Sequence, residues 1–273
     1  MTHDLGQLGK QTVYSNKYDP NLLFPIPRND NRSQLGIDPN RLKFHGVDIW
    51  NHYEISWLDS RGKPIVAIGE IIVPANSPNI VESKSMKLYF NGFNATKFSE
   101  SKELVDLVIK DLSGAVGTTV SFSLSEVDSA WAIEKFNGVC LDGIETDCTM
   151  FTPCPDYLKT IGEENVCEQL YSNLLKSNCL VTMQPDWGSV YIEYTGRKIE
   201  HAGLLKYIIS FREHNEFHEH CVERMFCDIM QRCTPKKLTV YARYTRRGGL
   251  DINPFRTLEA NVTLPKNIRL LRQ

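Results

Sequence analysis

The residues best suited to chemistry lie in the stretch 176–187, which reads Lys-Ser-Asn-Cys-Leu-Val-Thr-Met-Gln-Pro-Asp-Trp. Cys179 precedes Asp186 by seven residues. Residues 180–183 have strand character and a Pro-Asp turn follows, so we expect thiol and carboxyl at the same end of a sheet. A thiolate adds to electrophilic carbon, and a partly buried carboxyl donates a proton. The stretch therefore predicts a nucleophile and an acid working on one bound molecule.

Both residues also have a plainer interpretation. Most free cysteines are small buried hydrophobic residues, and an aspartate in a turn commonly caps its own backbone. What distinguishes Cys179 from the other seven cysteines is its polar setting, with Ser177 and Asn178 before it and Asp186 after it. The eight cysteines form no Cys-x-x-Cys pair, and we expect them to stay reduced.

A second polar cluster runs from His214 to Cys221 and opens a predicted helix. His218 lies three residues before Cys221, a spacing that a zinc site could use together with Cys179. Cys221 falls on an apolar stripe of the predicted helix, however, which makes zinc the minority interpretation. A solvated helix start is the plain alternative for the whole cluster.

Two carboxylates and several cations predict a nucleotide-like ligand. Glu82 and Glu219 each lie near a predicted helix start, and a carboxylate accepts two parallel hydrogen bonds from the edge of a guanine-like or pterin-like ring. Helix N-terminal charge, worth about 0.3–1 kcal/mol, is the plain alternative. The phosphates of a nucleotide could be bound by four cationic residues and two glycines: Lys84, Lys87, Arg246, Arg247, Gly248 and Gly249. The plain alternative for the Arg-Arg-Gly-Gly part is a turn with solvated arginines. The sequence has no Gly-x-Gly-x-x-Gly motif and no Walker loop.

Composition narrows the class of protein. The chain has 273 residues, a net charge of −2, 41% hydrophobic and 23% charged residues, which is ordinary for a globular protein with a substantial core. Near-zero charge argues against nucleic-acid and polybasic membrane binding. No apolar run approaches the roughly 18 residues of a spanning helix, and the first residues lack a signal-peptide pattern. We expect a cytosolic protein whose partner is a small molecule or another protein.

The elements that must position these residues form a weak internal repeat. Residues 45–127 predict a long hairpin, two helices and a strand, and the chain after 171 predicts the same order, with strands at 180–183 and 189–194. One alignment of the halves pairs three residues: Glu82 with Glu200, Tyr89 with Tyr207 and Phe93 with Phe211. We predict an α+β fold of two modules, each an antiparallel sheet backed by two antiparallel helices.

The predicted boundaries follow from this repeat. The first module spans 45–127, and the second, which carries Cys179, spans 171–273. Residues 128–170 hold Pro153, Pro155 and several acidic residues, and we expect them to connect the modules with at most one short strand. Residues 1–44 show little periodicity and are expected to form an extended arm over the body.

Four motifs in this order resemble one family: Glu82-Ser-Lys-Ser, Ser177-Asn-Cys with Gln184-Pro-Asp-Trp, Phe217-His-Glu, and Arg246-Arg-Gly-Gly. From about Tyr14 to Phe255 the chain resembles the long, two-module form of the NADPH-dependent 7-cyano-7-deazaguanine reductases, the nitrile reductases of queuosine biosynthesis. The resemblance implies two tandem tunnelling-fold modules, a homodimer, NADPH as cofactor, a 7-deazapurine nitrile as substrate, and no metal.

The resemblance also implies a role for each candidate residue. Cys179 would add to the nitrile carbon to form a covalent thioimide, and Asp186 would donate a proton to the nitrogen. The purine-like ring would be held by Val81, Glu82, Ser83, His218 and Glu219. NADPH would contact Ser83, Lys84, Arg247 and Gly248.

Two other classes stay open on the sequence. The first is a zinc-dependent cyclohydrolase of the same broad fold, with Cys179, His218 and Cys221 as zinc ligands for hydrolytic ring opening. The second is a non-catalytic purine-binding module, in which Cys179 would be dispensable.

Overall fold

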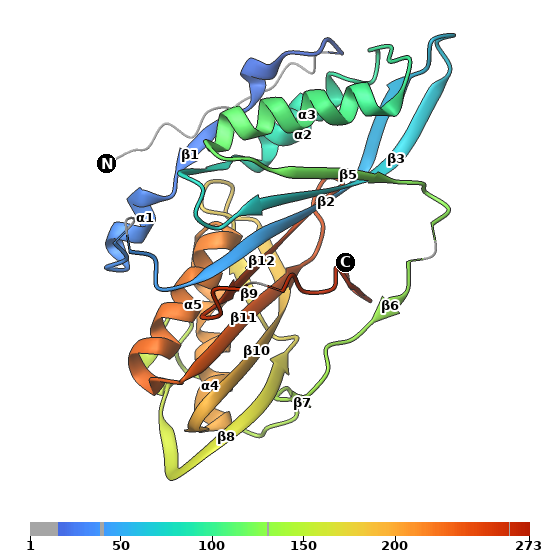
Figure 1. Cartoon of the computed structure of the whole chain (residues 1–273). Coiled ribbons are helices and arrows are strands. Elements are labelled where there is room, and N and C mark those ends of the chain that lie inside the picture. Colours follow the sequence, from blue (N-terminus) through green and yellow to red (C-terminus); the bar gives the residue numbers. More distant parts are fainter. Residues whose placement is uncertain (1–15, 39–40, 130, 262) are drawn as a thin grey trace. The chain divides into compact units, whose positions relative to one another are not determined.

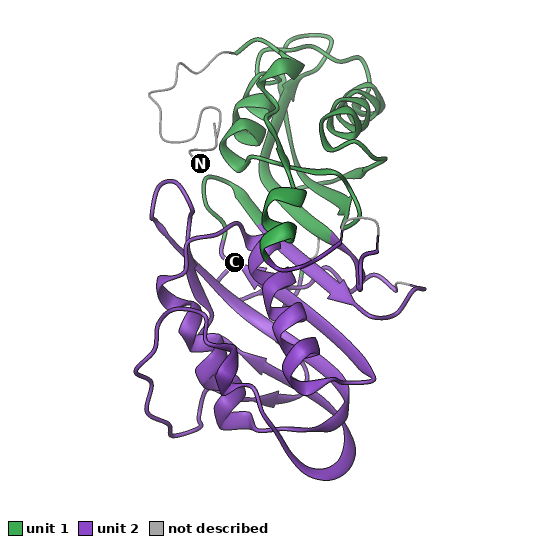
Figure 2. Ribbon diagram, turned by 90° about the vertical axis from the view of Figure 1, so that its left-hand side faces the viewer, with its two compact units in different colours: residues 1–34, 48–131, 246–251 green, residues 35–47, 132–245, 252–273 purple. Residues whose placement is uncertain are grey.

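The computed structural model describes residues 16–38, 41–129, 131–261 and 263–273 (Figure 1). The first 15 residues of the expected arm lie outside that description. The chain divides into two compact units, coloured separately in Figure 2. Unit 1 holds the described residues up to 34 together with 48–131 and 246–251, and unit 2 holds 35–47, 132–245 and 252–273. The expected arm is therefore shared, since residues 35–44 group with unit 2.

Unit 1 is built on the predicted long hairpin. Its strands are β2 (His45–Leu58), which begins in unit 2, and β3 (Pro64–Pro74), with β5 (Ser121–Ser125) antiparallel on the outer side of β3. Helices α2 (Ser83–Asn91) and α3 (Ser101–Val116) lie between β3 and β5 in the sequence, which confirms the predicted order of elements. The arm contributes a 3-10 turn, η1 (Pro20–Leu22), the strand β1 (Pro25–Pro27), which pairs with β4 (Asn79–Val81), and α1 (Asn29–Gln34).

The core of unit 1 lies between this sheet and α3. Alternate residues of β3 are buried, from Ala67 to Val73, as expected for a strand with one covered face. Helix α3 buries a stripe at every fourth residue: Leu104, Val108, Leu112 and Val116. It ends where Gly117 takes the left-handed conformation at φ 78°, a common helix stop.

Unit 2 carries a larger antiparallel sheet. Its main strands follow the order β12 (Leu250–Thr257), β11 (Lys237–Tyr244), β10 (Pro185–Ile199) and β8 (Thr160–Ser172), with the short β7 (Val139–Cys140) parallel to β8. The first two residues of β12 belong to unit 1. The helices are α4 (His201–Ile209) and α5 (His218–Cys233), joined through η3 (Ser210–Glu213). Smaller elements complete the unit: β6 (Ile133–Glu134) with β13 (Arg269–Leu270), η2 (Pro155–Tyr157), and β9 (Lys176–Asn178), which pairs with the start of β10.

Three sequence expectations for unit 2 are wrong in detail. Residues 180–183 form a turn rather than a strand, and the strand β9 comes before them. Residues 160–170 belong to the strand β8 rather than to a connection, because β8 pairs with β10 over residues 165–172 and again at Thr160. The first half of β8 is mostly exposed, so its sequence lacks the apolar alternation of a strand. The strand β12 was not expected at all.

The internal repeat is visible in the helices. Both α2 and α4 have nine residues and begin after a glutamate, Glu82 or Glu200. In each unit a tyrosine ring stands edge-on to a phenylalanine ring, with centroids 5.1 Å apart for Tyr89 and Phe93 and 5.3 Å apart for Tyr207 and Phe211. Each tyrosine hydroxyl donates to an aspartate on the second helix of its own unit: Tyr89 to Asp111 on α3, and Tyr207 to Asp228 on α5. The predicted α+β fold with antiparallel sheets and a repeated helix pair is confirmed at this level.

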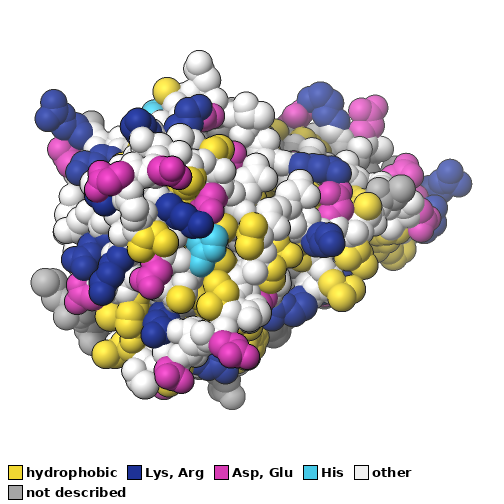
Figure 3. Space-filling model, turned by 90° about the horizontal axis from the view of Figure 1, so that it is seen from below, with side chains coloured by type: hydrophobic (Ala, Val, Ile, Leu, Met, Phe, Trp, Pro, Cys, Tyr) yellow, Lys and Arg dark blue, Asp and Glu magenta, His cyan; other side chains and the backbone are white. Residues whose placement is uncertain are grey.

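None of the described helices is long and apolar enough to cross a bilayer. Figure 3 shows positive and negative side chains interspersed on the face seen from below. Mixed charges of this kind lack the single-sign field that concentrates a polyanion.

His52 on β2 makes the stability of unit 1 sensitive to acid. The side chain is 4% exposed, its ring stands edge-on to Phe90, and its Nδ1 accepts from the Glu54 N–H. Burial, followed by the charge of Lys87, lowers the pKa of His52 to about 3. The unfolded chain takes up this proton near pH 6.5, whereas the folded chain does not, so stability falls as pH drops below about 6.5.

Replacing His52 with glutamine tests this effect. The His52→Gln protein keeps a neutral polar side chain but cannot titrate. Between pH 7 and pH 5 the wild type should lose about 2 kcal/mol more unfolding free energy than the variant. Urea unfolding at both pH values measures the difference, and a parallel loss in the two proteins would contradict a neutral buried His52.

Candidate active site

Cys179 lies in the loop of a short hairpin formed by β9 and the start of β10. The register places Ser177 opposite Asp186, and the Cys179 N–H donates to the Gln184 carbonyl at 2.9 Å. Residues opposite one another, and residues two apart on one strand, point to the same face. The thiol of Cys179 and the carboxyl of Asp186 therefore share one face of the hairpin. A loop rather than the expected strand separates the two residues, and their joint action on one molecule stays a prediction.

The segment before α5 fixes this hairpin. The Asn178 N–H donates to the His214 carbonyl at 2.8 Å, and the Glu216 N–H donates to the Asn178 carbonyl at 3.0 Å. The Asn178 side-chain amide donates to Asn215 at 3.0 Å, and the Lys176 ammonium donates to the Asn178 side-chain oxygen at 2.6 Å. Bonds on both sides of Asn178 hold the residue next to Cys179 in one position.

Asp186 faces His218 at the start of α5. The Asp186 carboxyl is 4% exposed, and its Oδ2 lies 3.4 Å from Nε2 of His218. The imidazole is stacked on the ring of Tyr244, with centroids 3.8 Å apart and planes 6° apart. The meeting of these three side chains could not be predicted from the sequence, because they come from β10, α5 and β11. The site thus holds a second proton-carrying group next to the predicted acid.

Much of the rest of the 214–221 cluster is buried, whereas His214, Asn215 and Phe217 are partly exposed. Glu219 is 2% exposed, and His220 is 3% exposed with its Nδ1 3.4 Å from a Glu216 carboxylate oxygen. The interpretation as a solvated helix start is therefore wrong. A buried carboxylate at the start of a helix is suited to binding a polar ligand edge.

The zinc alternative lacks its ligand set. Among the described residues, which include Cys179, His218 and Cys221, no group of three or more His, Cys, Asp or Glu side chains is placed to hold a metal ion. Cys221 is fully buried, and burial raises the pKa of its thiol far above the ordinary value. Zinc binds the thiolate, so this environment works against coordination.

In unit 1, Glu82 is the cap of helix α2. It is fully buried, and its two carboxylate oxygens accept from the N–H groups of Lys84 at 2.6 Å and Ser85 at 2.7 Å. Burial raises the pKa of Glu82. The plain helix-start interpretation is therefore realised. Oε1 also accepts from the Ser83 hydroxyl at 3.5 Å, whereas Oε2 keeps a further lone pair for a ligand. Val81, immediately before it, is 4% exposed, and Ser83 is partly exposed.

The Arg-Arg-Gly-Gly motif forms a tight hairpin turn in unit 1. Arg247 and Leu250 exchange backbone hydrogen bonds, and Gly248 and Gly249 have φ values of 58° and 75°. Positive φ at both central residues is the geometry of a type I′ turn, which glycine adopts without strain. A Cβ at Gly248 would lie 3.2 Å from the Lys87 side chain, so the turn packs against α2. The four expected cofactor residues therefore belong to one unit: Ser83, Lys84, Arg247 and Gly248.

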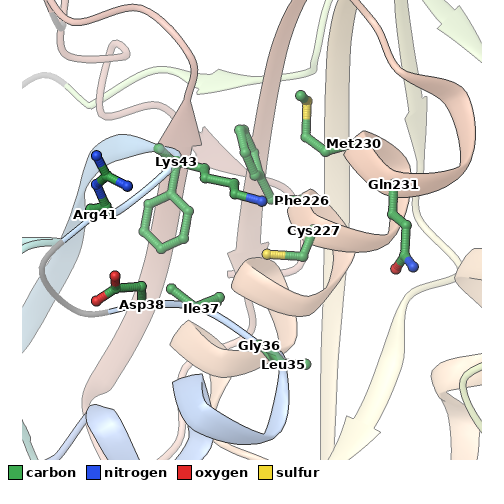
Figure 4. Close-up of a pocket in the computed structure, with 11 residues that line it drawn as sticks. Leu35, Gly36, Ile37, Asp38, Arg41, Lys43, Phe226, Cys227, Met230 and Gln231 are labelled. Carbon is green, nitrogen blue, oxygen red and sulfur yellow. The ribbon is translucent and has the colours of Figure 1, made fainter.

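The structure divides the other candidate residues between the units. Cys179, Asp186, His218 and Glu219 lie in unit 2, whereas Val81 and Glu82 lie in unit 1 with the expected cofactor residues. A cavity of about 520 Å³ in unit 2 contains none of them (Figure 4). It lies between the segment 35–44 and α5, with Phe226 and Met230 among its apolar lining.

Comparison with known proteins decides the family. Residues 14–124 match the family model described as "Nitrile reductase, 7-cyano-7-deazaguanine-reductase N-term", and residues 185–262 match the model "QueF-like protein". The chain is 54% identical, over 98% of its length and 94% of the relative, to the NADPH-dependent 7-cyano-7-deazaguanine reductase of Legionella pneumophila (strain Lens). The chain belongs to the 7-cyano-7-deazaguanine reductase family. The resemblance carried by the four motifs is thereby confirmed.

Other members of the 7-cyano-7-deazaguanine reductase family match over the same extent. Relatives of that name from Acidovorax ebreus (strain TPSY) and Ralstonia nicotianae (strain ATCC BAA-1114 / GMI1000) are 52% and 54% identical, over 100% and 97% of this chain and 99% and 97% of theirs. A solved structure, of the archaeosine synthase QueF-Like in the apo form, aligns with 38% of this chain and 100% of that chain at 16% identity and a TM-score of 0.31. That likeness is too weak to inform the fold.

Proposed function

We propose that this family member uses NADPH to reduce the nitrile of 7-cyano-7-deazaguanine to an aminomethyl group, a step of queuosine biosynthesis, through a covalent thioimide on Cys179. The observation that carries the mechanism is the β9–β10 hairpin, which presents Cys179 and Asp186 on one face with His218 beside Asp186. The names of the relatives support the substrate and the cofactor. The expected turnover is two NADPH oxidised per nitrile consumed, and a ratio of one would contradict the proposal.

The covalent step solves a chemical problem. A nitrile carbon accepts hydride poorly, whereas the C=N of a thioimide accepts it readily. The Cys179 thiol gives up its proton as its sulfur bonds to the carbon, one π bond of C≡N opens, and Asp186 protonates the nitrogen. In sum, one proton is moved from sulfur to nitrogen, and no atom is lost. NADPH, when bound, supplies two hydrides in succession, the first to the thioimide carbon. The sulfur then leaves with its electron pair to give an imine, which the second hydride and a further proton convert to the amine.

The proposed ring-binding residues supply the acceptors that the substrate requires. A 2-amino-pyrimidinone edge presents adjacent N–H donors, which a buried carboxylate such as Glu219 or Glu82 can accept in parallel. His218 and the residues flanking Glu82, Val81 and Ser83, complete the proposed set. Burial of Glu219 supports this role, because an acceptor without competing water discriminates more strongly between rings.

The proposed NADPH residues combine a glycine turn with cations. The Gly248 backbone allows close approach of a phosphate, and Lys84 and Arg247 supply charge. Replacing Lys84 with methionine should raise the KM for NADPH roughly tenfold or more, because one charge-assisted contact is lost. Steady-state kinetics measures this effect.

Two controls separate cofactor binding from other losses. Lys102→Met removes an exposed lysine of α3 that pairs with Asp106, and it should leave the KM unchanged. Thioimide formation without NADPH should proceed at the wild-type rate in Lys84→Met. A Lys84→Met protein with an unchanged KM would remove Lys84 from the cofactor site.

Removal of metal distinguishes the reductase from the zinc alternative. Because Cys179, His218 and Cys221 do not form a ligand set, dialysis against a strong chelator should leave both thioimide formation and nitrile reduction at the untreated rate. Metal analysis before and after dialysis provides the reference. Loss of activity together with one equivalent of zinc, restored by zinc alone, would favour the cyclohydrolase mechanism.

The wider assembly belongs to the same proposal. We infer that each unit is a tunnelling-fold module and that the protein acts in the cytoplasm as a homodimer. The antiparallel sheet and the paired helices of each unit support the fold. Residues 160–168, the first nine of the thirteen residues of β8, are mostly exposed along a sheet edge, which supports pairing between copies.

A further inference from the structure

The ring of Tyr244 stacks face-to-face on the imidazole of His218. Among the described residues, no other aromatic ring does so. The ring centroids lie 3.8 Å apart and the planes 6° apart. Tyr244 is fully buried at the end of β11, opposite Gly188 of β10. A Cβ at Gly188 would lie only 3.1 Å from the Tyr244 ring, so the glycine makes room for this ring. The stack is therefore a tight, specified contact.

The imidazole has no other anchor in the described chain. Its Nε2 faces Asp186 at 3.4 Å, and its Nδ1 is buried without a hydrogen-bond partner among the described residues. A catalytic histidine is usually oriented by a hydrogen bond at its second nitrogen. Because that bond is missing here, rotation about the histidine side chain is opposed mainly by the ring of Tyr244.

The peptide of Tyr244 is itself fixed by Gln273. The Gln273 side-chain nitrogen donates to the Tyr244 carbonyl at 3.0 Å and to Asn253 Oδ1 at 2.9 Å, and Asn253 Oδ1 also accepts from the Tyr244 N–H. The Gln273 oxygen accepts from Arg243 Nε at 2.8 Å and from the Leu270 N–H at 3.1 Å. All four hydrogen-bonding positions of this amide are used, which is the most constrained state of a glutamine side chain.

The ring of Tyr244, rather than its hydroxyl, supplies the function. The hydroxyl is buried next to the polar side chains of Ser177 and Cys221, but it makes no hydrogen bond of good geometry with any described residue. Burial, then the neighbouring Cys221 and Asp186, raise the pKa of Tyr244 well above its ordinary value, so the hydroxyl stays protonated. Removing only this oxygen, as in Tyr244→Phe, should cost little, because an unpaired buried group contributes no net stability.

We propose that Tyr244 is a positioning residue that holds the His218 imidazole against Asp186, and that Gln273 fixes Tyr244 for this purpose. The expected effect on thioimide formation rests on the proposed function. The expected effect on the order of the His218 ring rests on the stack alone. A small misplacement of a proton-transfer group costs on the order of 10²-fold in rate. Loss of the Tyr244 ring should therefore slow thioimide formation while leaving the KM for NADPH unchanged.

The test compares four variants with the wild type. Tyr244→Leu removes the ring, and Tyr244→Phe keeps it. Gln273→Ala removes the side-chain amide that fixes the Tyr244 peptide. Tyr194→Leu is the matched control, because Tyr194 is also fully buried in the sheet of unit 2 but bonds to Glu168. Histidine side-chain relaxation by NMR reports the order of the His218 ring, and quenched intact-mass kinetics without NADPH reports thioimide formation.

The expected results are specific to a positioning role. Tyr244→Leu should mobilise the His218 ring and slow thioimide formation roughly tenfold to hundredfold, Gln273→Ala should act in the same direction, and Tyr244→Phe should restore wild-type behaviour. Tyr194→Leu should lower only the melting temperature. In a His218→Ala background, Tyr244→Leu should have no further effect on the rate, because coupled residues are non-additive.

The outcomes separate the two proposals. An ordered His218 ring in Tyr244→Leu, or a full additional rate loss in the His218→Ala background, overturns the positioning role. If the order of the His218 ring is unchanged in Gln273→Ala, the proposed role of Gln273 in fixing Tyr244 is wrong. A mobile ring in Tyr244→Leu, combined with a wild type that forms no thioimide, supports the positioning role and rejects the proposed reaction.

Discussion

Replacing Cys179 with alanine is expected to abolish nitrile reduction, with a fall in kcat of about 10⁴-fold or more. Without the sulfur, hydride would have to add to the nitrile directly, which is the difficult step that the thioimide avoids. Cys179 is partly exposed and lies in a loop, so its loss should change stability by less than about 1 kcal/mol. NADPH oxidation in the presence of the nitrile measures the effect.

A second cysteine provides the matched control for this experiment. Cys167 is exposed on β8 and lies in the same unit, outside the hairpin that carries Cys179. The Cys167→Ala protein should reduce the nitrile at the wild-type rate. If Cys179→Ala retained more than about a tenth of the wild-type rate, Cys179 would not be the nucleophile. In other enzymes the loss of the nucleophile lowers the rate by several orders of magnitude.

Replacing Asp186 with asparagine is expected to lower kcat by about 10²–10⁴-fold, the usual contribution of a positioned general acid. Asparagine has nearly the same shape but no transferable carboxyl proton, so the nitrile nitrogen would acquire charge as sulfur adds. The nearby His218, 3.4 Å from Asp186, could donate in its place and set the residual rate. Thioimide formation should slow in the same proportion as turnover.

Asp228 offers a comparison for Asp186→Asn. It is buried in α5, accepts from the Tyr207 hydroxyl at 2.6 Å, and has a pKa that burial raises. Asp228→Asn should reduce stability without slowing thioimide formation. If both variants slow the reaction equally, the Asp186 effect is structural and another group protonates the nitrogen.

Features that depend on neighbouring residues in the sequence could be predicted. The cap at Glu82, the left-handed stop at Gly117 and the turn at Gly248 are local chemistry, and the structure contains all three. The shared face of Cys179 and Asp186 was also within reach, because a short hairpin fixes relative orientation. The strand expected at 180–183 was wrong, since Met183 takes a positive φ of 56° and closes the loop instead.

Features that depend on distant pairing could not be predicted. β8 is placed in the sheet by pairing with β10 and, at residues 170–171, with β7, and its exposed early residues have no apolar alternation to reveal it. Tyr244 stacks on His218, and His218 in turn lies beside Asp186. These residues come from β11, α5 and β10, and no spacing in the sequence encodes such contacts. The family resemblance supplied roles for His218 and Asp186 but not their mutual position.

Intact-mass analysis after adding 7-cyano-7-deazaguanine without NADPH tests the covalent mechanism most directly. The wild type should gain the mass of one nitrile molecule, since the thioimide forms by addition without loss of atoms, and peptide mapping should place that mass on Cys179. Adding NADPH should then remove it. An unmodified wild type, or an adduct that persists in Cys179→Ala, would contradict the thioimide mechanism.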